Sequence, residues 1–284
     1  MKKKSLQVRT ILAALPYIKE FSGETIVIKY GGAAQLTPEL RDKFAQDIVL
    51  LSLVGIKPVI VHGGGPKINE LLNKLDIKSE FIDGHRVTNA DAMKIVEMVL
   101  SGEINKNITS LLNHHGAKAI GISGKDSSFI KAVAKDDGKF GYTGSITHIK
   151  ADVLHKLIGE KFVPVIAPIA DSSIANHLGF NINADIAASK IAIALQAKKV
   201  LFLTDTVGVL DQDKKLIASL NQEDVDKLKA DGTIAGGMIP KVDACLDAVQ
   251  HGVQKAHIID GRVEHSILLE LFTSEGIGTQ FLQQ

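Results

Sequence analysis

Short apolar runs rich in β-branched residues recur along the chain, and each ends in a polar or glycine-rich turn. Runs of this length and composition predict buried β-strands. We expect strands at residues 26–28, 59–61, 119–122, 163–167, 199–203 and 256–259. Segments with helical spacing separate most of these runs. An alternation of strands and helices predicts an α/β fold with a mostly parallel sheet and helices on both faces.

The helices are marked by their ends as well as by their apolar spacing. Thr37 followed by Pro38 predicts a helix start, because threonine caps a first turn and proline fits the first helical position. Thr88 or Asn89 is a similar cap, and Pro16 predicts a kink in the first helix. We expect helices at residues 5–22, 37–54, 66–75, 89–113, 153–157, 184–195, 241–251 and 266–272, and hairpins within 129–149.

The composition excludes several classes of function. The 284-residue chain is 45% hydrophobic, which is enough for a sizeable core, and its net charge of +1 argues against a nucleic-acid or membrane-surface partner. Aromatic residues make up 5%, too few for the stacking platforms of single-strand binding. No apolar stretch approaches a membrane span, and the single cysteine, Cys245, fits a reducing compartment. These features predict a soluble, cytoplasmic protein.

Two strand endings near the start of the chain carry the first candidate chemistry. One predicted strand runs into Lys29, Tyr30 and then Gly31-Gly32, and the next runs into Gly63-Gly64-Gly65. Glycines at the end of a strand, with a helix following, present backbone N–H groups that suit phosphoryl oxygens. Alternatively, the lysine lies at the sheet edge with its ammonium in solvent, and the glycines form an ordinary turn. Neither stretch matches a Walker A loop or a dinucleotide-binding fingerprint.

Three further segments place charged or amide side chains at strand ends or helix starts. Arg86 lies in a predicted turn, where it either stays in solvent or grips a carboxylate. Asn181, Asn183 and Asp185 form a compact polar site at a helix N-terminus, although Asn183 also reads as a simple cap. Lys241 lies at a helix start, where a cation opposes the helix dipole. That local cost indicates a negatively charged partner.

Taken together, these segments resemble the amino acid kinase superfamily, and within it the N-acetyl-L-glutamate kinases. The resemblance covers essentially the whole chain and depends on the order and spacing of several motifs. They are Ile28-Lys-Tyr-Gly-Gly32, Val61-His-Gly-Gly-Gly-Pro66, Asp83-Gly-His-Arg-Val-Thr88, Ile122-Ser-Gly-Lys-Asp126, Asn181-Ile-Asn-Ala-Asp185, Leu203-Thr-Asp-Thr-Val-Gly-Val209 and Gly236-Gly-Met-Ile-Pro-Lys241. The resemblance implies an open αβα sandwich, with the acyl-amino acid on an N-terminal lobe (23–175) and ATP on a C-terminal lobe (176–284).

The resemblance also implies roles for individual residues. Lys29 and Lys241 would stabilise the transferring phosphoryl group, and Asp185 would orient both lysines. Substrate-binding residues would be Gly64, Gly65, Arg86, which holds the α-carboxylate, and Asn181. Nucleotide-binding residues would be Gly31, Gly32, Thr204, Asp205, Gly208, Val209 and Leu210. The reaction would be phosphorylation of the side-chain carboxylate of N-acetyl-L-glutamate by ATP, in arginine biosynthesis.

This reaction agrees with the chemistry of the residues. A side-chain carboxylate with a pKa of about 4.3 is ionised at neutral pH, so the acceptor requires no general base. Phosphoryl transfer then depends on positioning and on neutralising negative charge. The two lysines would do so together with Mg²⁺ bound through the nucleotide. We expect no metal site made of protein side chains.

The resemblance extends to regulation by arginine. In arginine-inhibited members of the family, a kinked N-terminal helix interlaces dimers into a hexamer, and residues 1–22 resemble that helix. Tyr17, His257, Glu270 and Gly276 are the candidate arginine contacts. The alternative is an ordinary C-terminal helix with a glycine-rich end. A nitrogen-regulatory protein is a possible further partner that no residue pattern supports.

Two other functions stay open at this point. A sister kinase could phosphorylate glutamate or aspartate, substrates that keep the α-ammonium that acetylation removes. A chain with the same fold could also be a non-catalytic arginine sensor. The presence of Lys29, Lys241 and Asp185 together argues against a sensor.

Overall fold

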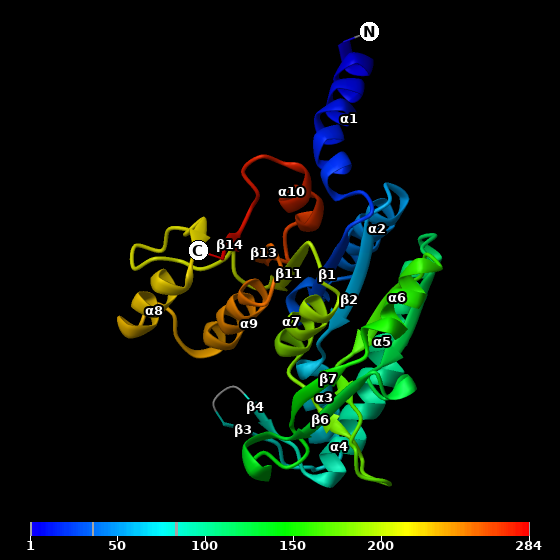
Figure 1. Cartoon of the computed structure of the whole chain (residues 1–284), viewed down its shortest axis with the longest axis vertical. Coiled ribbons are helices and arrows are strands. Elements are labelled where there is room, and N and C mark those ends of the chain that lie inside the picture. Colours follow the sequence, from blue (N-terminus) through cyan, green and yellow to red (C-terminus); the bar gives the residue numbers. More distant parts are fainter. Residues whose placement is uncertain (1, 36, 83–84, 284) are drawn as a thin grey trace.

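A computed structural model describes residues 2–35, 37–82 and 85–283, apart from the side chains of 2–7, 10, 33 and 85. Its centre is an eight-stranded sheet (Figure 1). In spatial order the strands are β12 (Ser219–Leu220), β14 (Thr279–Phe281), β13 (Lys255–Asp260), β11 (Lys199–Thr204), β1 (Thr25–Tyr30), β2 (Lys57–His62), β8 (Val163–Ala167) and β5 (Ala119–Ser123). Neighbouring strands of this sheet pair in parallel except β13 and β14. The predicted α/β fold with a mostly parallel sheet is confirmed.

Helices cover both faces of the sheet, as the alternation of its side chains requires. Val27, Val59 and Phe202 pack on one face, against α6 (Ala151–Gly159), α7 (Ala184–Ala194) and α9 (Ile239–Gln250). Ile28 and Leu201 pack on the other, against α2 (Pro38–Leu53), α5 (Asn105–His114) and α10 (Ser266–Phe272). Successive residues of a strand point to opposite faces, so one strand supplies both cores. The result is an αβα sandwich.

Three antiparallel pairs form separate two-stranded sheets, and the strands of two of them are labelled in Figure 1. They are β3 (Glu80–Ile82) with β4 (His85–Val87), β6 (Ile130–Ala134) with β7 (Gly144–Ile149), and β9 (Ile169–Ala170) with β10 (Phe180–Asn181). The predicted hairpin within 129–149 is the β6–β7 pair. Arg86, which the sequence placed in a turn, lies in strand β4 instead. Strand β3 pairs with it, a pairing that no local sequence signal revealed.

The helix predicted at residues 89–113 is divided. It consists of α4 (Ala90–Glu97), a π-helical turn η2 (Met98–Ile104) and α5, in unbroken succession. Asn89, rather than Thr88, is the cap of α4, and its side chain accepts a hydrogen bond from Ala92 N. Short π-helical insertions often occur near functional sites. Here the insertion places Leu100 and Ile104 against the glycine loop that follows β2.

The remaining elements are helical or short. Helix α1 (Lys2–Phe21) contains Pro16 and projects from the body of the molecule (Figure 1). Helices α3 (Gly65–Lys74) and α8 (Gln222–Ala230) complete the set together with η1 (Gly32–Gln35), η3 (Asp126–Ser128), η4 (Lys135–Gly138) and η5 (Gly236–Met238). Helix α8 was missed, although Asn221 and Asp224 form a capping box at its start. In the described part of the chain, no helix combines the length and the apolarity that crossing a membrane requires.

Parallel strands bring distant parts of the chain to one edge of the sheet. Tyr30 at the end of β1 pairs in register with His62 at the end of β2, and Lys29 pairs with Phe202 of β11. The glycines after β1 and β2 and the polar residues after β11 therefore share the carboxyl edge. In open α/β sheets this edge is where ligands bind.

Candidate active site

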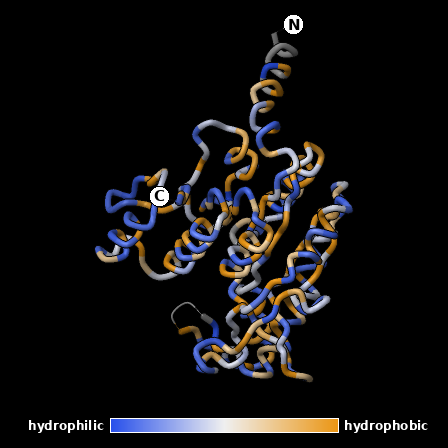
Figure 2. Tube along the Cα trace, in the orientation of Figure 1, coloured by the Kyte–Doolittle hydropathy of each residue, from blue (hydrophilic) through white to orange (hydrophobic). Residues whose placement is uncertain are grey.

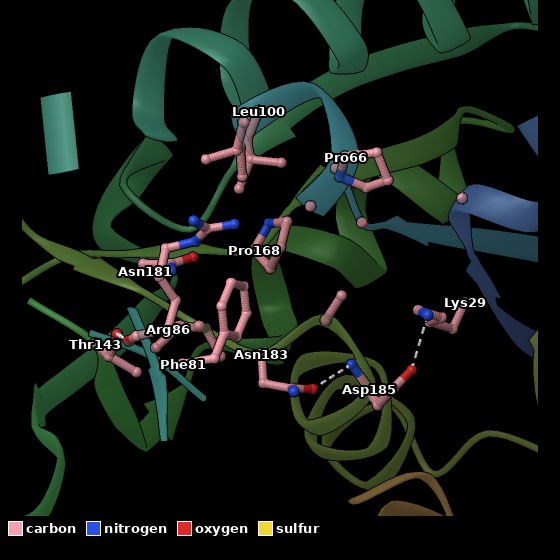
Figure 3. Close-up of a pocket in the computed structure, with 17 residues that line it drawn as sticks. Lys29, Pro66, Phe81, Arg86, Leu100, Thr143, Pro168, Asn181, Asn183 and Asp185 are labelled. Atoms are coloured by element: carbon pink, nitrogen blue, oxygen red, sulfur yellow. Dashed lines mark hydrogen bonds and ion pairs between the residues drawn. The ribbon is translucent and has the colours of Figure 1, made fainter. Parts of the chain in front are cut away.

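A cavity of about 240 Å³ lies at the carboxyl edge of the sheet (Figure 3). Its walls come from the end of β1, the loop between β2 and α3, strand β4, the residue before β7, and the segment from β10 into α7. Seven predicted site residues line it: Lys29, Gly32, Gly64, Gly65, Arg86, Asn181 and Asp185. Residues from all along the chain that the sequence assigned to one site thus do meet around one cavity.

Two lysines share one buried carboxylate beside this cavity. Lys29 Nζ lies 2.9 Å from Asp185 Oδ1, and Lys241 Nζ lies 3.0 Å from Asp185 Oδ2. Burial alone would raise the pKa of Asp185, but the charges of Lys29 and Lys241 outweigh it and hold that pKa below its usual value. Asp185 is therefore an ionised group that positions two ammonium groups. Lys241 itself does not line the cavity among the described residues; it reaches the site through this ion pair.

The start of α7 explains why Asp185 is held in place. Asn183 caps the helix, and its side-chain oxygen accepts hydrogen bonds from the N–H groups of Asp185 and Ile186. A carboxylate in the first turn of a helix is favoured by the helix dipole. Asp185 is thus fixed by the backbone cap on one side and by two cations on the other. Asn183 is a structural cap, and it also lines the cavity.

Close packing explains some of the glycines in these two loops, and the need for accessible backbone N–H groups explains another. A Cβ at Gly31 would lie 2.3 Å from the backbone oxygen of Leu203 on β11, so the strand packing itself requires glycine there. A Cβ at Gly64 would lie 2.5 Å from Ile104 Cδ1, in the π-helical turn. Gly65 opens α3, and the first N–H groups of a helix have no partner within it. This loop therefore offers backbone donors to an anion in the cavity.

Arg86 is a buried cation that faces the cavity. Its side chain donates hydrogen bonds to Ser79 Oγ and, at 2.7 Å, to Asn69 Oδ1, and its guanidinium lies 4.6 Å from the ring centroid of Phe81. Burial lowers the pKa of Arg86, and no carboxylate in the described part of the chain forms an ion pair with it. The residue is only 6% exposed, so the interpretation as a solvent-exposed loop arginine is wrong. A buried arginine with neutral partners has its charge available for a ligand anion.

Asn181 lies beside Arg86 in the cavity wall (Figure 3). Its Nδ2 donates to Thr88 Oγ1 at 3.3 Å, and Thr88 Oγ1 lies 2.9 Å from Thr143 Oγ1. Thr143 lines the cavity and is almost fully buried. Sequence reasoning missed both threonines, because a lone threonine in a predicted hairpin or helix cap carries no signal of its own. The apolar wall residues were also missed, because a single apolar residue carries no signal of a site; they are Phe81, Leu100, Pro168 and Ile182.

His62 supports the glycine loop from within the core. Its Nδ1 lies 3.1 Å from Gly63 O, and its Nε2 lies 3.2 Å from Asn105 Nδ2. Because an amide nitrogen can only donate, Nε2 is the acceptor and Nδ1–H donates to the loop carbonyl. Burial lowers the pKa of His62 to about 4, so the ring is neutral at physiological pH. His62 is thus a neutral structural residue beside the glycine loop.

The predicted nucleotide residues fall into two groups. Gly32 lines the cavity. Thr204 ends β11 and Asp205 follows it at the same sheet edge, where Thr204 Oγ1 donates to Asp205 Oδ1 at 3.1 Å. Gly208, Val209 and Leu210 lie further along this loop and line no part of the cavity among the described residues. Val209 N donates to Thr279 Oγ1 at 2.8 Å, and a Cβ at Gly208 would lie 2.5 Å from that same oxygen. The packing against β14 thus accounts for Gly208 and Val209 without a ligand.

A second polar cavity, of about 240 Å³, lies between α1, β13 and α10. All four candidate effector residues, Tyr17, His257, Glu270 and Gly276, line it. His257 Nδ1 lies 2.7 Å from Glu270 Oε1, and both side chains are buried. Burial lowers the pKa of His257. Burial would raise the pKa of Glu270, but causes that include the hydrogen bonds from His257 and Ile277 N hold it below its usual value. His257 Nε2 is buried and has no partner among the described residues.

Comparison with known proteins places the chain in a family. The sequence profile of the amino acid kinase family matches residues 24–260. Two acetylglutamate kinases, from Nitratiruptor sp. and Wolinella succinogenes, are 67% and 63% identical; the first match covers 99% of both chains and the second 100% of both. The structure of an N-acetylglutamate synthase from Neisseria gonorrhoeae with coenzyme A and N-acetyl-glutamate has a TM-score of 0.87 at 25% identity, and the match covers 98% of this chain and 63% of that one. The chain therefore belongs to the amino acid kinase family and, within it, to the acetylglutamate kinases.

Proposed function

We propose that this enzyme transfers the γ-phosphoryl group of ATP to the side-chain carboxylate of N-acetyl-L-glutamate, forming N-acetyl-L-glutamyl 5-phosphate in arginine biosynthesis. The observation that carries the proposal is the charge arrangement of the cavity. Arg86, a buried cation without an acidic partner among the described residues, lies at one part of it, and Lys29 and Asp185 lie at another (Figure 3). Lys241 joins them through its ion pair with Asp185. A dicarboxylate fits this arrangement, with one carboxylate on Arg86 and the other toward the lysines.

The residues have separate tasks in the proposed reaction. Arg86 and Asn181 hold the α-carboxylate end of the substrate, and the N–H groups of the glycine loop hold the reacting carboxylate. Lys29 and Lys241 oppose the negative charge that builds up on the transferring phosphoryl group. Asp185 keeps both ammonium groups aimed at one point. The nucleophile is already ionised, so no proton has to be removed from it.

Mg²⁺ would enter with the nucleotide. In the described part of the chain, no group of three or more histidine, cysteine, aspartate or glutamate side chains could hold a metal ion. Mg²⁺ commonly binds through substrate phosphates and waters with few protein ligands, which fits this donor set. When bound, it would neutralise part of the phosphate charge. We place the nucleotide over the C-terminal lobe (176–284), beside Gly31, Gly32 and the Thr204–Leu210 loop, and the acyl-amino acid on the N-terminal lobe (23–175).

The cavity favours an N-acylated substrate over free glutamate or aspartate. A free amino acid carries an α-ammonium, which would need an acidic partner in the wall. Asp185 is the one carboxylate among the described residues that line the cavity, and both of its oxygens are engaged by lysines. Apolar side chains, including Leu100 and Pro168, supply instead a surface suited to a methyl group. The sister-kinase alternative is therefore the weaker one.

We also propose that arginine binds the second cavity and inhibits the enzyme. Burial lowers the pKa of His257, which favours the neutral ring. In the neutral ring Nδ1–H donates to Glu270, so the unpartnered Nε2 is an acceptor, and Glu270 adds a carboxylate. An acceptor and a carboxylate together suit a guanidinium group. A structural relative, the N-acetylglutamate synthase of Neisseria gonorrhoeae, has been solved with L-arginine, at 25% identity and a TM-score of 0.82.

Helix α1 contributes both to this cavity and to the proposed contact between subunits. Tyr17 near its end lines the cavity, while Ile11, Leu12 and Leu15 are 69%, 59% and 55% exposed on a helix that projects from the body (Figures 1 and 2). We propose that residues 1–22 join dimers into a hexamer through these side chains. The single free cysteine, Cys245, is buried and fits a reducing compartment, so we place the enzyme in the cytoplasm. A nitrogen-regulatory partner has no support in these surfaces.

The deciding experiment measures ADP release with ATP and Mg²⁺ for a panel of acceptors: N-acetylglutamate, glutamate and aspartate, with and without arginine. We expect turnover with N-acetylglutamate alone and inhibition by arginine. Absence of turnover with every acceptor would favour the non-catalytic sensor. Removal of residues 1–22 is expected to preserve turnover, to abolish the hexamer in light scattering and to weaken the arginine response. A truncated protein that stays hexameric would contradict the role given to α1.

A further inference from the structure

Two buried threonine hydroxyls connect the two residues that line the α-carboxylate end of the cavity. Thr143 Oγ1 donates a short hydrogen bond to the backbone oxygen of Arg86 and lies 2.9 Å from Thr88 Oγ1. Thr88 Oγ1 in turn accepts from Asn181 Nδ2 at 3.3 Å. The exposed fractions of Thr88 and Thr143 are 0% and 3%, so solvent does not compete for these hydrogen bonds.

The number of hydroxyl hydrogens gives this series of hydrogen bonds a single donor-to-acceptor direction. The backbone oxygen of Arg86 can only accept. Thr143 Oγ1 is the hydroxyl nearest to it, whereas Thr88 Oγ1 lies 3.5 Å away, so this oxygen takes the hydrogen of Thr143. Thr143 Oγ1 can then only accept from Thr88, which uses the one hydrogen of Thr88. Thr88 Oγ1 is left as an acceptor, and of the two polar atoms in the Asn181 amide only Nδ2 can donate to it. The reverse amide orientation would place Oδ1 against an oxygen without a free hydrogen.

We propose that Thr143 and Thr88 are positioning residues that set the amide orientation of Asn181 through this directional hydrogen-bond chain, while Thr143 also holds the backbone of Arg86. The inference rests on the proposed function, in which Asn181 and Arg86 hold the acceptor substrate. An asparagine amide can present either its oxygen, which accepts a hydrogen bond from a substrate, or its nitrogen, which donates one. A fixed orientation spares substrate binding the cost of selecting one.

Backbone hydrogen bonds around the two threonines hold their hydroxyl groups in position. Tyr142 N donates to Thr88 O at 2.7 Å, and Asn181 N donates to Tyr142 O at 2.8 Å, so the segment before β7 lies between β4 and β10. Gly141 has a φ of +62°, and a Cβ there would lie 2.4 Å from Thr88 O. The segment therefore packs directly against Thr88, with no room for a side chain at position 141. Its function in the structure is to carry the Thr143 hydroxyl between the two binding residues.

Valine and serine substitutions separate the effect of the hydroxyl group from the effect of side-chain shape, because valine keeps the shape and serine keeps the hydroxyl. Thr88→Val removes the acceptor of Asn181 but leaves the bond from Thr143 to Arg86. Thr143→Val frees the hydrogen of Thr88, so that both amide orientations of Asn181 can be satisfied. For each valine variant we expect at least a tenfold rise in KM for N-acetylglutamate, a kcat within threefold of wild type and an unchanged KM for ATP. Thr88→Ser and Thr143→Ser, which keep the hydroxyl, are expected to retain the wild-type KM.

A double-mutant cycle tests whether Thr88 acts through Asn181. In an Asn181→Ala background, Thr88→Val is expected to change the KM for N-acetylglutamate less than twofold, because the group it orients is gone. The proposal is overturned if Thr88→Val leaves that KM unchanged in the wild-type background, or if its full effect persists without Asn181. Should a valine variant fail to fold, Thr88→Ala or Thr143→Ala, which add no branched side chain, answer the same question. Failure of the wild type to phosphorylate N-acetylglutamate would instead refute the proposed function.

Discussion

Lys29 Nζ lies 2.9 Å from Asp185 Oδ1, which joins the end of strand β1 to the first turn of helix α7. The other oxygen of Asp185 holds Lys241 of α9, so one carboxylate aligns two ammonium groups from separate elements. Neither lysine needs to contact the other, and their mutual repulsion is offset by the charge between them. The geometry is set before any phosphate arrives, as electrostatic stabilisation of a transition state requires.

Asp185→Asn is expected to lower kcat by about 100-fold, a loss typical of removing one group that organises transition-state charge. The amide keeps the shape but leaves two neighbouring ammonium groups without a counter-charge, so they move apart. Steady-state kinetics with both substrates measure the effect. Asp247→Asn is the matched control, because Asp247 forms a 2.9 Å ion pair with Lys190 between the same two helices, away from the cavity. An Asp185→Asn enzyme with wild-type turnover would rule out the alignment role.

Lys241→Ala is expected to reduce turnover by about 100-fold or more while changing the KM for N-acetylglutamate only slightly. The reason is that Lys241 does not line the acceptor cavity among the described residues and reaches the site through its ion pair with Asp185, so it affects charge that develops during transfer. Lys190→Ala, which breaks an ion pair to α9 elsewhere, should leave both constants near wild type. Unchanged turnover in Lys241→Ala would remove this lysine from catalysis.

His62 should make the stability of the fold fall in mild acid. Its folded-state pKa is lowered to about 4 from an unfolded value of about 6.5, so between these values the unfolded chain binds the proton and the folded chain does not. Stability is therefore lost as pH falls from about 6.5 to 4, by about 3 kcal/mol from this residue. Urea unfolding of His62→Gln, compared with wild type across that range, is expected to show a smaller acid loss. His148→Gln, which changes an exposed histidine, is the control. Identical pH profiles for wild type and His62→Gln would contradict the prediction.

The two glycines after β1 should respond differently to alanine. Gly31→Ala would bring a Cβ to 2.3 Å from Leu203 O, a backbone atom that cannot move without displacing β11. We expect a loss of about 1–3 kcal/mol in the free energy of unfolding, the usual cost of overpacking. Gly32→Ala meets nothing closer than 3.8 Å and should keep the stability of the wild type. Equal stability of the two variants would show that β1 and β11 adjust to one another more freely than this packing allows.

The sequence predicted best what is encoded locally. β-Branched runs followed by glycine located the ends of β1 and β2, and with them Lys29 and the Gly63–Gly65 loop. The N-caps Thr37 and Asn183 also follow from local chemistry, because each bonds its own helix. Features of this kind require only neighbours in the chain.

Other features depend on contacts between distant segments. The burial of Arg86 depends on Asn69, Ser79 and Phe81, which the β3–β4 pair and helix α3 bring around it. The role of Thr143 arises only when the β6–β7 hairpin lies between β4 and β10. The π-helical turn at 98–104 likewise has no sequence signature in a continuous helical pattern. The candidate site was therefore found through its charged residues, whereas the groups that position them were not.

Glu270→Gln is expected to raise the arginine concentration for half-maximal inhibition at least tenfold and to leave uninhibited turnover within twofold of wild type. The amide oxygen still accepts a hydrogen bond from Ile277 N, and the amide nitrogen can donate to His257 Nδ1 in the other tautomer of that ring, so the loop after α10 keeps its support. The negative charge facing a guanidinium is lost. Glu275→Gln changes an exposed glutamate in the wall of the same cavity and should alter inhibition little, since solvent screens its charge. Inhibition curves of ADP release at increasing arginine measure both variants. If Glu270→Gln stays as sensitive as wild type, the cavity between α1, β13 and α10 is not where arginine acts; if wild type itself is insensitive, regulation by arginine is absent from this enzyme.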